Sequence, residues 1–293
     1  MKKIILGTDW WTDCDDAVAV RLLCRAAKAG EIDFQGIIIN ACMEHSVASM
    51  KNFLNAEGMA QLPVGIDLEA TDFIGKPSYQ KGLAALGEPS ANESAEDGVA
   101  LYRRLLANAE DKIDIIEIGF MNVVAALLES GPDEVSPKTG MELVSEKVGR
   151  FWVMAGKWDD NPGSEHNFNL CPRARENAHI FCKKCPVPIT FLGFEIGVSV
   201  ITGGNLLEGD LLHQVLRDHG SANGRCSWDP MTALMAVIGD EAQAGYDVMR
   251  GKASVDPATG ENYFEPSEDG PHCYVIKKFE DAYYEEAINR RIS

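Results

Sequence analysis

The sequence predicts an α/β protein with a mostly parallel central sheet flanked by helices. Short runs of apolar and β-branched residues alternate along the chain with longer stretches whose apolar residues recur at helical spacing. The predicted strands are almost continuously apolar, as expected for strands that helices cover on both faces. Such alternation of strand and helix is typical of a parallel sheet joined by helical crossovers.

The first half of the chain follows this pattern closely. The predicted strands are short and apolar, and cover residues 3–6, 34–40, 62–66 and 113–118. The predicted helices between them cover residues 16–29, 45–58 and 95–109. Gly30 ends the first of these helices. Residues 67–92 are rich in Gly, Pro and Ser, which predicts a long loop over a site.

The second half continues the alternation with one interruption. Further strands are predicted at residues 150–154, 188–192 and 273–278, and helices at 123–129, 173–184 and 280–290. Residues 250–270 are rich in turn-forming residues and predict no regular element. Because no repeat or linker divides the chain, we expect residues 1–293 to form a single domain.

Composition excludes several classes of function. The 293 residues include 27 Lys and Arg against 45 Asp and Glu, for a net charge of −18. This charge repels nucleic acids and anionic membranes, so neither is an expected partner. No apolar run approaches the length of a membrane span, and the apolar run after Lys3 is too short for a signal peptide. We therefore expect a cytoplasmic protein.

Four carboxylates follow the first predicted strand within eight residues: Asp9, Asp13, Asp15 and Asp16. One of them could cap the following helix, but a helix start has few free N–H groups. The others would repel one another unless a cation or proton neutralises them. Oxygen ligands without paired His or Cys suit Ca²⁺ or Mg²⁺, although the spacing matches neither an EF-hand nor a phosphate-binding loop.

Residues 8–17 (TDWWTDCDDA) resemble the N-terminal aspartate cluster of the inosine–uridine-preferring nucleoside hydrolase family. The cluster is similar to a longer-loop variant, with two extra residues before its Asp-Asp-Ala end. The likeness continues in order through Asn40 and residues 119–122, 153–156, 165–167 and 228–230. It implies the Rossmann-like nucleoside hydrolase fold, and a homo-oligomer, because members are often dimers or tetramers.

The resemblance also implies the site residues. Asp9, Asp16 and Asp229 would supply carboxylates to one Ca²⁺ ion. A backbone carbonyl would come from Asn122, or from Met121 in a second possible register. The implied substrate contacts are Asp15, Asn40, Met154, Asn161, Glu165, Asn167 and Trp228.

By this resemblance the protein is a Ca²⁺-dependent N-glycosyl hydrolase that releases ribose and free base from a ribonucleoside. Asp9 would accept a proton from a Ca²⁺-bound water. Pyrimidine-active members carry His where this chain has Trp228, which can stack on a base but cannot act as an acid. A purine-like or pre-activated leaving group, and hence a role in purine nucleoside catabolism, is implied; plain packing is the alternative role of Trp228. His166 could replace the acid or have a structural role.

Two other functions stay open at this point. The altered acid position and the Trp10–Trp11 pair are compatible with a hydrolase of another ribosylated compound on the same scaffold. A catalytically silent ribose- or nucleoside-binding protein would need fewer carboxylates, because each desolvated and unpaired carboxylate costs stability.

Overall fold

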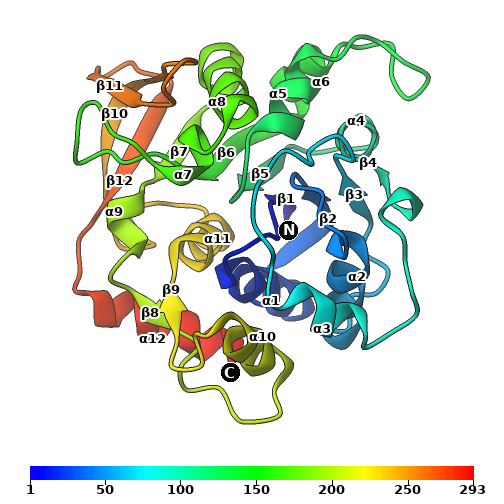
Figure 1. The fold of residues 1–293 in the computed structure, drawn as a ribbon. Helices are drawn as coiled ribbons and strands as arrows, with labels where there is room; N and C mark the ends of the chain where they lie inside the picture. The colour runs from blue at the N-terminus through cyan, green and yellow to red at the C-terminus, as the bar shows by residue number, and fades with distance from the viewer.

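The structure is a computed structural model that describes residues Met1–Ser293 and centres on one ten-stranded sheet (Figure 1). The strands lie in the order β11-β10-β12-β7-β6-β5-β1-β2-β3-β4. Neighbours from β12 to β4 run parallel, whereas β10 is antiparallel to both β11 and β12. The predicted mostly parallel sheet is therefore confirmed. A separate antiparallel pair is formed by β8 and β9.

The strands have the following bounds: β1 Lys2–Thr8, β2 Ile32–Ile39, β3 Val64–Ile66, β4 Glu96–Asp97, β5 Ile113–Glu117, β6 Val148–Met154, β7 Ile189–Leu192, β8 Ile201–Thr202, β9 Arg225–Cys226, β10 Tyr246–Val255, β11 Asn262–Pro266 and β12 His272–Lys277. The helices are α1 Asp15–Lys28, α2 Ser46–Ala56, α3 Gln80–Ala84, α4 Gly98–Ala107, α5 Asn122–Glu129, α6 Gly140–Lys147, α7 His166–Asn169, α8 Pro172–Lys184, α9 Phe194–Gly197, α10 Leu211–His219, α11 Trp228–Ile238 and α12 Asp281–Ile292, with a 3₁₀ turn at Asn92–Ser94.

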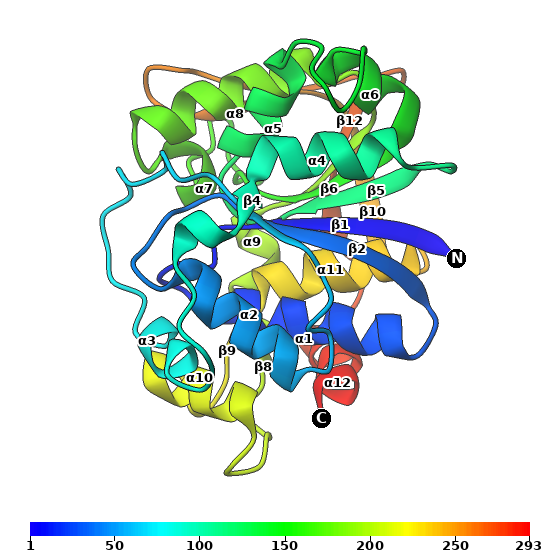
Figure 2. The same cartoon turned by 90° about the vertical axis from the view of Figure 1, so that its right-hand side faces the viewer.

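Helices cover both faces of the sheet. In Figure 2, α4, α5, α6 and α8 lie above the sheet, and α1, α2, α11 and α12 lie below it. The two faces bury separate apolar clusters of 49 and 30 residues, which explains why the parallel strands are apolar along their whole length. None of the helices combines the length and apolar character that a membrane crossing requires.

Two predicted irregular segments contain regular structure. Residues 250–270 were expected to be turns, but most of them form β10 and β11, an antiparallel hairpin at one edge of the sheet. Ala253 and Val255 are buried while the residues beside them are exposed, so the strand shows its apolar face only at alternate positions. The expected loop at residues 67–92 is mostly loop, but it includes α3 and the start of the 3₁₀ turn.

The parallel strands place their carboxyl ends at one edge of the molecule. In Figure 2, β1 runs away from the N-terminus toward the side on which α7 and α9 lie. The loops that follow β1, β5, β6 and β7 therefore meet at this edge. An open α/β sheet binds its ligands at this place, beyond the carboxyl ends of its strands.

Candidate active site

The loop between β1 and α1 is held by a strained turn at Trp10. This residue has φ of 47°, in the left-handed region that a tryptophan rarely adopts. Its indole is fully buried and donates a hydrogen bond to the Ser49 hydroxyl at 2.9 Å, and this packing holds the backbone in place. The turn directs the N–H of Trp10 to Asp16 (3.2 Å) and that of Trp11 to Asp9 (3.1 Å).

Helix α11 brings a fourth carboxylate to this loop from the far end of the chain. Asp229 lies in its first turn, and its backbone N–H donates to Asp15 at 3.1 Å. Carboxylate oxygens of Asp15, Asp16 and Asp229 lie within 4.8 Å of one another. Asp9 is buried at the same cavity. We call Asp9, Asp15, Asp16 and Asp229 the aspartate cluster.

The aspartate cluster is electrostatically unfavourable without a cation. Burial raises the pKa of Asp9, Asp15 and Asp229 well above the usual aspartate range, and repulsion between the carboxylates adds to the shift. Burial also raises the pKa of Asp16 to about 7, although the Thr8 hydroxyl donates a hydrogen bond that opposes this shift. The cluster therefore holds protons near neutral pH unless a positive charge replaces them.

The donor set of the cluster fits a hard divalent cation. No lysine, arginine or histidine forms an ion pair with any of the four aspartates. All the side-chain donors are carboxylate oxygens, the ligands that Ca²⁺ and Mg²⁺ prefer. Ile118 lines the same cavity just beyond β5, and no hydrogen bond of the protein reaches its backbone carbonyl. That carbonyl is a further oxygen available to a cation.

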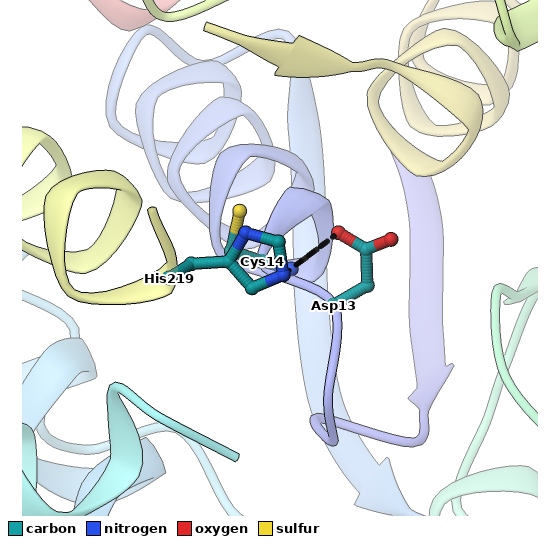
Figure 3. A group of neighbouring side chains, drawn as sticks. All are labelled: Asp13, Cys14 and His219. Carbon is teal, nitrogen blue, oxygen red and sulfur yellow. Dashed lines mark hydrogen bonds and ion pairs between the residues drawn. The ribbon is translucent and has the colours of Figure 1, made fainter. Parts of the chain in front are cut away.

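Asp13 lies in the same loop but has a partner of its own. The guanidinium of Arg225 donates two hydrogen bonds to its carboxylate, at 2.8 and 2.5 Å. His219 lies near the same carboxylate, with its Nε2 3.9 Å from Asp13 Oδ1, and Cys14 follows Asp13 in the chain (Figure 3). Burial opposes ionisation here, but the Arg225 hydrogen bonds hold the pKa of Asp13 below its usual value. Asp13 is therefore neutralised without a metal.

Two further polar side chains are fixed beyond the end of β6. Glu165 caps α7: its carboxylate accepts hydrogen bonds from the N–H groups of Gly156 (2.9 Å) and Asn167 (2.8 Å). The Asn167 amide donates to the Met154 carbonyl at 2.9 Å. Burial raises the pKa of Glu165 to about 7, although its backbone hydrogen bonds oppose this shift. Both side chains are oriented before any ligand arrives.

These segments enclose one cavity of about 270 Å³. Its wall combines carboxylates, an amide and aromatic rings. The lining residues are Asp9, Trp11, Thr12, Asp13, Asp15, Asp16, Ile118, Met154, Glu165, His166, Asn167, Phe194, Trp228 and Asp229. The cavity thus contains most of the residues predicted from the sequence.

Three predicted residues do not line this cavity. Asn40 is fully buried, and its side chain accepts from the Phe120 N–H at 3.0 Å. Asn122 donates to the Asn40 carbonyl (3.1 Å) and to Asp67 (2.6 Å), and lines a neighbouring cavity instead. Asn161 is exposed and its nearest hydrogen bonds, at 3.4 Å, reach the strand β11. Each amide is engaged by another segment of the protein.

The aromatic part of the wall was only partly predicted. Trp228 stacks on Phe194 with ring centroids 5.5 Å apart, and its indole N–H donates to the Phe194 carbonyl at 2.8 Å. Trp11 stacks on His166 at 5.8 Å and 21° between planes. Phe194 and Ile118 were not predicted. Their signal was their position directly after a strand, which marks the sheet edge where ligands bind.

No protein-family model matches the sequence, and no curated protein matches it.

Solved structures are similar over the full length. A plant nucleoside hydrolase matches with a TM-score of 0.74 and 16% identity, over 99% of this chain and 98% of that one. A purine-preferring ribonucleoside hydrolase from Gardnerella vaginalis gives the same four values. An inosine–uridine-preferring nucleoside hydrolase from Bacillus anthracis matches with a TM-score of 0.71 and 16% identity, over 100% and 99% of the chains. The fold of the chain is therefore the nucleoside hydrolase fold.

Proposed function

We propose that the protein is a Ca²⁺-dependent N-glycosyl hydrolase that splits a ribonucleoside into ribose and free base. The observation that carries this proposal is the aspartate cluster, which is buried at the cavity and has no cationic side chain as a partner. A fold shared with nucleoside hydrolases supports the same reaction class. A scaffold alone does not fix function, so the residues of the site carry the argument.

The cation would be held by Asp9, Asp16 and Asp229, together with the free carbonyl of Ile118. The resemblance implied a carbonyl from Asn122 or Met121, and we propose Ile118 instead because it lines the cavity. When bound, a divalent cation would balance the carboxylate charge and make a nearby water more acidic.

The side chains around the cation would divide the remaining work. Asp9 would accept the proton of the attacking water, because its carboxylate is buried beside the cavity and ionises once the charge is balanced. Asp15 would accept hydrogen bonds from the ribose hydroxyls. Glu165 and Asn167, which are already oriented by backbone hydrogen bonds, would bind the sugar from the segment that follows β6. Met154 would contact the same sugar.

The base would leave along the aromatic wall. Trp228 and Phe194 form a stacked pair there, and an aromatic surface favours a flat purine ring. Because the indole N–H of Trp228 is bonded to the Phe194 carbonyl, Trp228 offers the base a surface rather than a proton. We therefore propose a purine nucleoside as the substrate, and nucleoside breakdown as the role.

The test is ribose release from a panel of purine and pyrimidine ribonucleosides. We expect turnover of a purine nucleoside that EGTA abolishes and added Ca²⁺ restores. Asp9→Asn should lower kcat by about 10²–10⁴-fold, because it removes the general base. Asp247→Asn is the matched control, since Asp247 is exposed on β10 and should leave turnover unchanged. Full activity in EGTA and in Asp9→Asn would contradict the proposed mechanism.

A second candidate is a hydrolase of another ribosylated compound. The bonded indole of Trp228 favours it, because a leaving group that needs no proton would suit this wall. Turnover of a ribosylated non-nucleoside, with the nucleosides inert, would support this candidate. Binding of ribose without turnover of any compound would instead indicate a silent binding protein.

A further inference from the structure

The wall of the cavity contains one imidazole, that of His166. The neighbouring Glu165 is held as an acceptor, because both of its oxygens receive backbone hydrogen bonds. The N–H of Trp228 is bonded to a carbonyl. The other N–H and O–H groups of the wall belong to an indole, an amide and a threonine, which do not release protons near neutral pH. The carboxyl groups of the wall already accept hydrogen bonds from the protein or face the proposed cation, so His166 is the titratable side chain of the wall that stays free for proton transfer.

The side chain of His166 is accessible from the cavity and is not packed in the core. It is exposed to the cavity, and its ring makes no hydrogen bond within the protein. By contrast, ring nitrogens of His179, His219 and His272 are bonded to Val255, Ser221 and Ala253 respectively. The free nitrogens of His166 are therefore available to a ligand.

The ring is nonetheless held in one orientation. His166 begins α7 between Glu165 and Asn167, whose side chains are both fixed by hydrogen bonds. Its imidazole stacks on Trp11 at 5.8 Å and lies 6.2 Å from the Phe120 ring. Burial lowers the pKa of His166, while the Asp13 carboxylate opposes the shift. A lowered pKa makes the imidazolium a stronger acid.

We infer that His166 is the general acid that protonates the departing base. The inference rests on the proposed hydrolysis and assigns one of its steps. As the C1′–N bond breaks, its electron pair goes to the base, and a base nitrogen takes the proton of the imidazolium. The water oxygen bonds to C1′ and its proton goes to Asp9. Exchange with solvent then returns Asp9 to the carboxylate and His166 to the imidazolium, so that one water is consumed per ribose and base.

The test compares two leaving groups. The first substrate is the purine ribonucleoside that the wild type cleaves fastest, and the second is 4-nitrophenyl β-ribofuranoside, whose phenolate leaves without a proton. His166→Phe keeps an aromatic ring on Trp11 but removes the acid, and His166→Gln keeps only a hydrogen-bonding group. Both variants should lose about 10²–10⁴-fold in kcat on the nucleoside while cleaving the nitrophenyl riboside at nearly the wild-type rate. His213→Phe, on α10 outside the cavity, is the control and should change neither rate.

Several outcomes would overturn the inference. An equal loss on both substrates would assign His166 to sugar binding or to the shape of the site. Unchanged nucleoside turnover in both variants would exclude it as the acid. A wild type that cleaves the nitrophenyl riboside but no nucleoside would also contradict it, because such an enzyme lacks an acid. A wild type that cleaves neither substrate would fail before any variant is made, and would refute the proposed hydrolysis itself.

Discussion

Helix α1 contributes to two groups of buried charged side chains that differ in how their charge is balanced. At its first turn, Asp15 and Asp16 join the aspartate cluster, which has no cationic partner. One to two turns later, Arg21 is almost fully buried and bonds to Glu57 at 2.7 Å and to Asp210 at 2.6 Å. The protein thus supplies the counter-charge of Glu57 and Asp210 itself. No cationic side chain does so for the aspartate cluster, which fits the bound cation that we propose there.

Asp229→Asn should separate function from stability most strongly. Turnover should fall by more than about a thousandfold, since a bound cation contributes several kcal/mol to the transition state. The metal-free protein should nevertheless melt at a higher temperature than the wild type, because one of four repelling carboxylates is gone. Steady-state kinetics and calorimetry in EGTA measure the two effects. Asp218→Asn on α10 serves as the control and should change neither. A lower melting temperature for Asp229→Asn would contradict the proposed repulsion.

Glu57→Gln should have the opposite effect. Arg21 would keep Asp210 but lose its charged hydrogen bond to Glu57, which should cost about 1.5–3 kcal/mol of unfolding free energy. Turnover well below the melting temperature should be unchanged, because Glu57 does not line the cavity. Urea unfolding measures the loss, and Glu31→Gln is the matched control, since its ion pair with Arg291 lies on the surface. Equal unfolding free energies of the two variants would show that the buried Arg21–Glu57 pair stabilises the protein no more than the surface pair does.

The sequence predicts some residues of the site and not the partners of others, for a physical reason. Four carboxylates within eight residues cannot all be satisfied locally, so the aspartates of the loop were visible as a site in the sequence. The pairing of Asp13 with Arg225 joins residues 212 positions apart and needed the fold. The same holds for Asn122, whose amide is engaged by Asp67 from another loop.

The strands likewise divide into those that the sequence predicts and those that it does not. Parallel strands that are buried on both faces appear in the sequence as continuous apolar runs, and these strands were predicted. The edge strand β10 has an exposed face, and its buried residues include Gly251 and Ala253, which give little strand signal. It was therefore expected to be irregular. His166 shows the limit of residue type alone, because its role depends on which nitrogens stay free of hydrogen bonds.

A divalent cation should stabilise the folded protein by binding the aspartate cluster. The ion pairs of Arg21 with Glu57 and Asp210 should not contribute to this effect. At a Ca²⁺ concentration of about 100 times Kd, the unfolding free energy should rise by about 2.7 kcal/mol. Thermal unfolding with and without Ca²⁺ measures this increase. The increase should persist in Glu57→Gln and disappear in Asp229→Asn, because only the second variant lacks a cation ligand. A similar increase in both variants would place the cation elsewhere.

His272 shows a third way to bury an ionisable group, which is to keep it neutral. It lies on β12, where its Nδ1 accepts a hydrogen bond from the Ala253 N–H at 2.9 Å. Burial lowers the pKa of His272 to about 4, and the nearby Lys252 adds to the shift. In the unfolded chain the pKa returns to its ordinary value of about 6.5, so the unfolded state binds more protons between these values. The stability that His272 contributes is therefore complete above pH 6.5 and is lost as the pH falls toward 4.

This loss should amount to about 2 kcal/mol between pH 7 and pH 5. Urea unfolding at the two pH values measures this contribution as a difference between variants, because the buried carboxyl groups, whose pKa values are raised, change the stability of each variant equally. From pH 7 to pH 5 the change in stability should be about 2 kcal/mol less favourable for the wild type than for His272→Asn, whose amide oxygen can still accept from Ala253. His213→Asn should show the wild-type change, because His213 on α10 makes no comparable buried hydrogen bond. If His272→Asn changes by as much as the wild type, His272 is not the group that titrates. That result would contradict the conclusion that His272 is buried as a neutral imidazole.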